Sequence, residues 1–158
     1  MNSVKQKRHQ NLKYTTRRRA ERLLKDWANF SFERFSRTHP EIEIKPPATF
    51  FTAKDKFDEF QRLLRTAWRE SDPYKFKMLC FRFMTLYRGG WELGPVELAV
   101  FHFIDVRDRA LRCKNPDCRA PYFFRTKKGQ EYCCPKCAIP AQRAAKLRWY
   151  EKQKEENK

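Results

Sequence analysis

This 158-residue chain has about half as many acidic as basic residues and lacks long apolar runs, and we find no catalytic motif in it. No stretch approaches the roughly 18 to 20 uncharged apolar residues of a membrane span, so we expect no transmembrane helix. The first eight residues lack the apolar region of a signal peptide, so we expect a cytoplasmic protein. No His-rich cluster or Gly-rich phosphate loop is present, which argues against an enzyme.

The charge that is present is strongly positive and lies at the two ends of the chain. The chain has 36 Lys or Arg residues against 19 Asp or Glu residues, a formal net charge of +17. Residues 1–25 and 112–158 carry about +8 each, whereas residues 26–111 are nearly neutral. Such an arrangement favours a polyanion partner, with nucleic acid as the leading candidate and a membrane surface disfavoured.

The nearly neutral middle reads as a helical body. With 41% hydrophobic and 15% aromatic residues the chain should fold, and its length suits one core with a small appended module. We expect a basic flexible arm over residues 1–13, or a phosphate-tracking one, and a helical domain over residues 14–112.

About four helices are predicted in this body from their capping residues and apolar spacing. The first starts at Thr15 or Thr16 and runs through Phe35, and a loop or edge strand over residues 39–47 follows it. The second starts after Thr52, with Asp55 completing an N-terminal cap. The third runs from Asp72-Pro73 to Gly89-Gly90, and the fourth from Gly94-Pro95 to Leu111.

Several residues of these helices are assigned structural roles only. Cys80 is distant from the other cysteines and is expected to be a buried apolar side chain, and His102 has no partner at ligand spacing. Four phenylalanines are expected in the core: Phe81, Phe83, Phe101 and Phe103.

Five of the six cysteines form the strongest pattern in the sequence. Cys113 and Cys118 are separated by four residues, and Cys133-Cys134 and Cys137 follow after a further fourteen. Two close pairs around a short hairpin supply the four ligands of a tetrahedral zinc site. Disulfides are the main alternative, but they are rare in a reducing compartment, and a redox pair of Cys134 and Cys137 would leave the first pair unexplained. Whether Cys133 or Cys134 is the third ligand stays open on spacing alone.

The rest of residues 113–158 fits a small zinc module. Residues 122–125 and 131–133 are expected to form two strands around a turn that contains Gly129. A basic helix should follow Cys137, tolerating Pro140 in its first turn. This helix is either a solvated charged helix without a partner or a surface that contacts nucleic acid. The predicted contacts in this module are Arg125, Lys127, Lys128, Arg143, Lys146, Arg148, Trp149 and Tyr150.

The two cysteine pairs, the run 132–137 and the basic helix together resemble CGNR-type zinc fingers and their relatives with a Tyr-Cys-Ser-x-x-Cys second pair. These modules lie at the C-terminus of small bacterial proteins with a helical N-terminal domain, which are regarded as DNA-binding transcription regulators. The resemblance implies that Cys133 and Cys137 complete the zinc site and that Cys134 takes the Ser position. The tetrad that names the family would begin at Cys137, but the chain departs from it after that residue, so the roles of its Gly, Asn and Arg do not carry over.

These observations lead to one preferred hypothesis and two alternatives. We expect a zinc-containing regulator that binds duplex DNA, with a helical body that senses a signal or forms a homodimer. The first alternative is an RNA-binding or ribosome-associated zinc protein, in which aromatic residues stack on unpaired bases. The second is a protein-interaction module whose basic helix binds an acidic partner.

Overall fold

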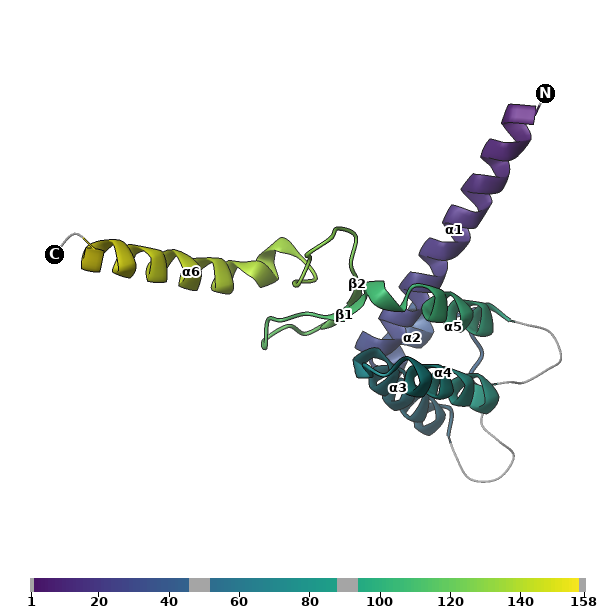
Figure 1. The fold of residues 1–158 in the computed structure, drawn as a ribbon. Helices are drawn as coiled ribbons and strands as arrows, with labels where there is room; N and C mark the ends of the chain where they lie inside the picture. Colours follow the sequence, from purple (N-terminus) through teal and green to yellow (C-terminus); the bar gives the residue numbers. More distant parts are fainter. Residues whose placement is uncertain (1, 46–51, 88–93, 157–158) are drawn as a thin grey trace.

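The computed structural model describes residues 2–45, 52–87 and 94–156, with side chains from residue 16 onward except that of residue 86. Its elements in chain order are α1 (Asn2–Asn29), α2 (Phe32–Thr38), α3 (Ala53–Arg69), α4 (Pro73–Tyr87), α5 (Pro95–Asp105), the 3-10 turn η1 (Arg107–Arg109), β1 (Ala110–Arg112), β2 (Tyr122–Phe124) and α6 (Pro135–Glu156). The predicted fold class is confirmed, because a helical body precedes a two-stranded sheet, a cysteine cluster and a C-terminal helix (Figure 1).

The first helix differs from its prediction at both ends. α1 begins at Asn2, so residues 2–13, expected as a flexible arm, are helical and project away from the body (Figure 1). It ends at Asn29, well before Phe35, because Ser31 caps α2 by accepting a hydrogen bond from the backbone N–H of Arg34. The division into domains at residues 13 and 112 stays a prediction.

Three of the four predicted helix starts are confirmed: α5 begins at Pro95 after Gly94, and side-chain caps mark the starts of α3 and α4. The Thr52 hydroxyl accepts from the N–H of Asp55 at 3.2 Å, and the Asp55 carboxylate accepts from the N–H of Thr52 at 3.0 Å. Asp72 accepts from the N–H groups of Tyr74 and Lys75, both at 2.8 Å, at the start of α4. Hydrogen bonds from the side chain and the backbone of Thr52 lower the pKa of the Asp55 carboxyl. The predicted helix end at Gly89-Gly90 lies outside the described residues.

The core is built from aromatic rings of several helices. Trp27 of α1 is fully buried, and its ring centroid lies 4.7 Å from that of Phe35 and 5.7 Å from that of Phe57. Trp68 of α3 lies 4.8 Å from Phe103 of α5 and 4.9 Å from Phe124 of β2. The core therefore extends from the helices into the first part of the C-terminal module.

Two of the four phenylalanines predicted in the core lie elsewhere. Phe83 and Phe103 are buried, but Phe81 is 47% exposed and Phe101 is 41% exposed. Members of each pair are two residues apart on a helix, about 200° around its axis, so both cannot face the same side. The prediction was wrong for Phe81 and Phe101 because it followed residue type without this rotation. Cys80 is buried as predicted, and burial raises the pKa of its thiol to about 12.

The two-stranded sheet differs from the prediction in the segments that form its strands. β1 pairs antiparallel with β2, with Ala110 opposite Phe124 and Arg112 opposite Tyr122. The fourth predicted helix therefore ends at Asp105, short of Leu111, and residues 131–133 form no strand. The turn was predicted correctly, because Gly129 has a φ of +77°, which favours glycine. Residues 39–45 form no strand either, and residues 46–47 of that predicted loop lie outside the described residues.

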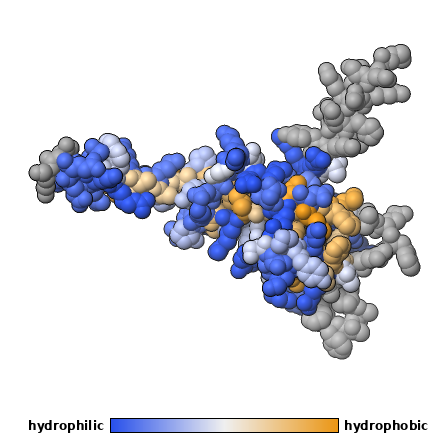
Figure 2. All heavy atoms as spheres, viewed as in Figure 1, coloured by the Kyte–Doolittle hydropathy of each residue, from blue (hydrophilic) through white to orange (hydrophobic). Residues whose placement is uncertain are grey.

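The two basic ends of the chain point in different directions. α1 packs against α5 and α3 against α4, while α6 extends away from these helices (Figure 1). Figure 2 shows a mainly hydrophilic surface along α6 and apolar patches over the body. None of the described helices is both long enough and apolar enough to cross a membrane.

Candidate metal centre

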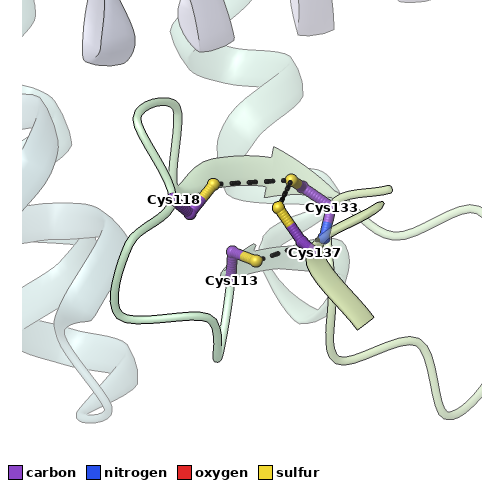
Figure 3. A group of neighbouring side chains, drawn as sticks. All are labelled: Cys113, Cys118, Cys133 and Cys137. Atoms are coloured by element: carbon purple, nitrogen blue, oxygen red, sulfur yellow. Dashed lines mark hydrogen bonds between the residues drawn. The ribbon is translucent and has the colours of Figure 1, made fainter. Parts of the chain in front are cut away.

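Four cysteine side chains converge at one point of the C-terminal module. The sulfur atoms of Cys113, Cys118, Cys133 and Cys137 all lie within 4.8 Å of one another (Figure 3). Cys133 Sγ is 3.6 Å from both Cys118 Sγ and Cys137 Sγ. A tetrahedral site with zinc–sulfur bonds of about 2.3 Å places its sulfurs about 3.8 Å apart. The cluster therefore has nearly the dimensions of a four-sulfur metal site.

The first cysteine pair is held by the loop between the two strands. Cys113 directly follows β1, and its N–H donates to the carbonyl of Pro121 at 2.7 Å. Asn115 folds the chain between the pair: its carbonyl accepts from the N–H of Cys118, and its side chain accepts from the N–H of Asp117 at 3.0 Å. Such an Asx turn brings Cys118 back toward Cys113.

The second pair lies where the turn of residues 126–130 leads into α6. The N–H of Cys133 points at Cys113 Sγ, with 3.5 Å between nitrogen and sulfur. Cys137 lies in the first turn of α6, so this helix carries one of the four sulfurs. The N–H of Lys114 donates to the carbonyl of Glu131 at 3.1 Å, and this bond ties the two halves of the site together.

Cys134 lies outside the cluster although it adjoins Cys133. Its side chain is exposed, whereas Cys133 is partly buried among the other sulfurs. The structure thus selects Cys133, as the family resemblance implied and as spacing alone could not. A backbone hydrogen bond from Cys137 is the main cause that lowers the pKa of the Cys134 thiol.

The chemistry of the cluster suits a bound metal. Burial raises the pKa of the Cys133 thiol, and hydrogen bonds with the neighbouring sulfurs raise it further. A metal ion would replace this proton, and the four cysteines would then form a closed coordination shell. Four sulfur donors are the ligand set of structural zinc sites, so the residues fit zinc. Such a site leaves no open position for an activated water.

Hydrogen bonds fasten the segment around the four cysteines, residues 110–137, to the helical body. We call this segment the metal module. The side-chain amide of Asn29, the last residue of α1, donates to the carbonyl of Tyr122 at 2.8 Å and accepts from its N–H at 3.1 Å. Arg69 of α3 donates to the Tyr122 hydroxyl at 2.8 Å, and Trp68 Nε1 donates to the carbonyl of Leu111 at 3.1 Å. Both strands are thereby anchored to α1 and α3.

The predicted nucleic-acid contacts fall into two separate groups. Arg125 follows β2 and pairs with Asp108 at 3.1 Å, and Lys127 and Lys128 are exposed on the following turn. The second group is exposed on α6 and consists of Arg143, Lys146, Arg148, Trp149 and Tyr150. Lys146 Nζ lies 5.7 Å from the centre of the Tyr150 ring. Arg125 is therefore already held by an acid of the body, while the α6 group faces solvent.

Four basic residues that the sequence prediction did not name as contacts face the metal module. Arg18, Arg19, Arg22 and Lys25 of α1 line a cleft together with Phe123, Phe124 and Cys133. The net positive charge of residues 1–25 pointed to a basic N-terminal segment. That charge gave no sign that α1 docks beside β2, because the contact joins residues about one hundred positions apart.

The histidine assigned a structural role lies in a polar cluster of the body. His102 Nε2 is 3.2 Å from a carboxylate oxygen of Glu21, and Arg109 Nη1 is 2.9 Å from the same oxygen. Glu21 is thus held by two partners from α5 and η1.

Comparison with known proteins adds no identification. No family model matches the chain, and no curated protein or solved structure matches it either. The resemblance to CGNR-type zinc fingers stays a prediction from the cysteine pattern.

Proposed function

We propose that this protein binds nucleic acid through a module built around a structural zinc ion, and that duplex DNA in transcription regulation is its target. The observation that carries the proposal is α6, a 22-residue helix with no buried residue, which contains Cys137 of the cluster and extends away from the helical body (Figure 1). Because α6 contributes nothing to a core, its exposed basic surface is available to a partner.

The dimensions and charge of α6 suit a duplex. At about 1.5 Å per residue it extends for roughly 33 Å, and the major groove admits a single α-helix. Arg143 and Lys146 lie about three residues apart on its exposed surface, where their charges can reach phosphates or base edges. Toward the C-terminal end Lys152 pairs with Glu156 at 3.6 Å, so the half nearer the cysteines offers the freer positive charge.

Zinc has a structural role in this proposal. The four cysteines would hold it in a closed shell and would fix the start of α6 through Cys137. The chain's own contribution is to aim the helix, because Cys137 belongs to α6 while Cys113 belongs to the segment that follows β1. The site has no catalytic step in this proposal. The proposed location of the protein is the cytoplasm.

One observation favours RNA as a second candidate. Trp149 is 57% exposed and Tyr150 is 52% exposed, and their rings lie 5.0 Å apart. Exposed aromatic rings beside basic residues can stack on unpaired bases, which a regular duplex does not offer.

The proposal is tested by the salt dependence of binding. Arg143→Ala/Lys146→Ala removes two cations from the near half of α6, and Lys152→Ala/Lys154→Ala removes two from the far half as a matched control. We expect the first pair to lower the slope of log affinity against log salt by up to about 1.8 on duplex DNA, at about 0.9 per lost phosphate contact. The control should change the slope by less than half as much.

Fluorescence anisotropy with labelled duplex DNA and single-stranded RNA, on protein with confirmed zinc content, measures both slopes. Selection from mixed random pools at near-physiological salt then separates the targets. Recovery of a short duplex motif supports the DNA regulator, and enrichment of RNA moves the function to the second candidate. No retention of either pool overturns nucleic-acid binding altogether.

A further inference from the structure

A basic cleft of about 700 Å³ lies between α1 and the metal module. One wall is the C-terminal half of α1, which contributes Arg18, Arg19, Arg22 and Lys25. Phe123 and Phe124 of β2, both buried, line the opposite side. Hydrogen bonds between Asn29 and Tyr122 hold the helix and the strand together beside this cleft. The cleft is thus a feature of the docked structure and not of either segment alone.

The charge of this cleft is strongly positive. Among the described residues that line it, Glu21 is the only acid, and Glu21 is engaged by Arg109 at 2.9 Å and by His102 at 3.2 Å. Arg22 and Lys25 both approach Asp26, but only at 3.6 and 4.0 Å, and Asp26 is also 3.2 Å from His39. The Arg22 side chain is 68% exposed and that of Lys25 is 48% exposed, so an incoming anion can reach both.

The basic residues of α1 are spaced for a polymer of phosphates. Arg18, Arg22 and Lys25 fall four and three residues apart, which places them along one face of the helix. They span about 10.5 Å along the helix axis at 1.5 Å per residue, and phosphates of one DNA strand rise by about 3.4 Å each. With the two axes parallel, this span equals about three phosphate steps, so each of the three cations can lie beside a phosphate of one strand.

A second cleft continues the first toward α6. It has a volume of about 510 Å³ and lies between the 126–130 turn and the start of α6, with Lys127, Pro135 and Ala138 among its lining residues. Thr126, Gln130 and Cys133 line both clefts, so the two meet on the metal module. A surface track thus leads from the basic face of α1, across the turn that carries Lys127, to the base of α6.

We infer that the first cleft is a binding site for the phosphodiester backbone, and that α1 and α6 hold one nucleic acid from two sides of the metal module. This inference rests on the proposed function and adds a second contact surface to it. A zinc ion with four thiolates carries a net charge of −2, so the phosphates contact the α1 wall and not the Cys133 end of the cleft.

The test compares two double variants that remove the same number of charges. Arg22→Ala/Lys25→Ala acts within the cleft, and Lys75→Ala/Lys77→Ala removes two exposed cations of α4 that line neither cleft. On duplex DNA we expect the cleft variant to lower the salt slope by up to about 1.8 and to weaken binding at least fivefold at near-physiological salt. The α4 variant should stay within twofold of the wild type.

Zinc content and far-UV circular dichroism are measured on each variant, and Arg22→Gln/Lys25→Gln replaces the alanine pair if that pair fails to fold. An unchanged slope for the cleft variant, beside a reduced slope for Arg143→Ala/Lys146→Ala, overturns this inference and leaves the proposed function standing. Absence of nucleic-acid binding by the wild-type protein overturns both. Reduced slopes for both variants, and a summed reduction when the four substitutions are combined, support one nucleic acid held by both helices.

Discussion

The helical body and the C-terminal module are each stabilised by a different kind of interaction. In the body, Trp27, Phe35, Phe57, Phe60 and Phe83 are almost completely buried and in ring contact, whereas α6 contains no buried residue. Between the two lies the segment of residues 110–137, whose buried side chains are Cys113 and the three residues of β2. Burial of apolar surface stabilises the first region. The C-terminal module is too small for a core of its own and depends on the cysteine cluster and on its hydrogen bonds to α1 and α3.

This difference in stabilisation predicts which region each kind of change should unfold. A hydrophobic core responds to side-chain volume, while a metal-held module responds to ligand chemistry. The strand β2 belongs to both regions, because Tyr122 and Phe124 lie in the core and the strand borders the cysteine loop. Order in the C-terminal module should therefore be lost from the cysteines outward, with β2 the last part to detach.

Withdrawal of the metal is expected to have the largest effect. Structural zinc contributes about 10–16 kcal/mol of apparent binding free energy in zinc-finger peptides, so chelation should unfold residues 113–137 and leave α3 and α4 folded. Amide hydrogen exchange measures both regions in one experiment. Cys118→Ser should give the same pattern without a chelator, and Cys134→Ser should retain the metal. Equal protection of the amides of residues 113–137 from exchange, with and without metal, would show that this segment does not depend on the metal.

A pair of tryptophan substitutions compares the regions with the same residue type. Trp27→Ala opens a cavity among the core rings and should lower the free energy of unfolding by about 3–5 kcal/mol. Trp149→Ala removes an exposed ring of α6 and should change it by less than about 0.5 kcal/mol. Urea denaturation followed by circular dichroism, at equal zinc content, measures both. A loss of more than about 1 kcal/mol for Trp149→Ala would show that α6 packs against something in the free protein.

The third prediction concerns Cys80, which lies in the hydrophobic core. Burial raises the pKa of Cys80 to about 12, so between pH 9 and 12 the unfolded thiol has lost its proton while the folded one keeps it. The folded state then binds more protons, and Cys80 should lower the free energy of unfolding by about 1.4 kcal/mol per pH unit in that range.

Denaturation of the wild type and of Cys80→Ala at several pH values from 8 to 10.5 isolates this contribution, because every other titrating group is shared. The variant should lose less stability than the wild type as the pH rises above 9. Parallel profiles would mean that the Cys80 thiol ionises in the folded protein.

Short-range hydrogen bonds explain which parts of the fold could be predicted. Thr52 with Asp55, and Asp72 with Lys75, close their caps within three residues, and the helix starts followed from the sequence. The break at Ser31 is also local, but a serine beside an apolar stripe that continues to Phe35 is a weak signal. The strand pairing of Leu111 with Phe123 is not local and was not predicted.

The amino-acid sequence by itself determined that the chain has a helical body, basic ends and a candidate metal site at two cysteine pairs, because helix caps and close ligand pairs act over a few residues. Only the tertiary structure decided that Cys133 and not Cys134 lies in the cluster, that Phe81 and Phe101 face outward, and that the basic face of α1 lines a cleft with β2. Each of these outcomes depends on which surfaces meet when distant segments pack. The hydrogen bonds between Asn29 and Tyr122, which join positions 93 residues apart, are the clearest instance.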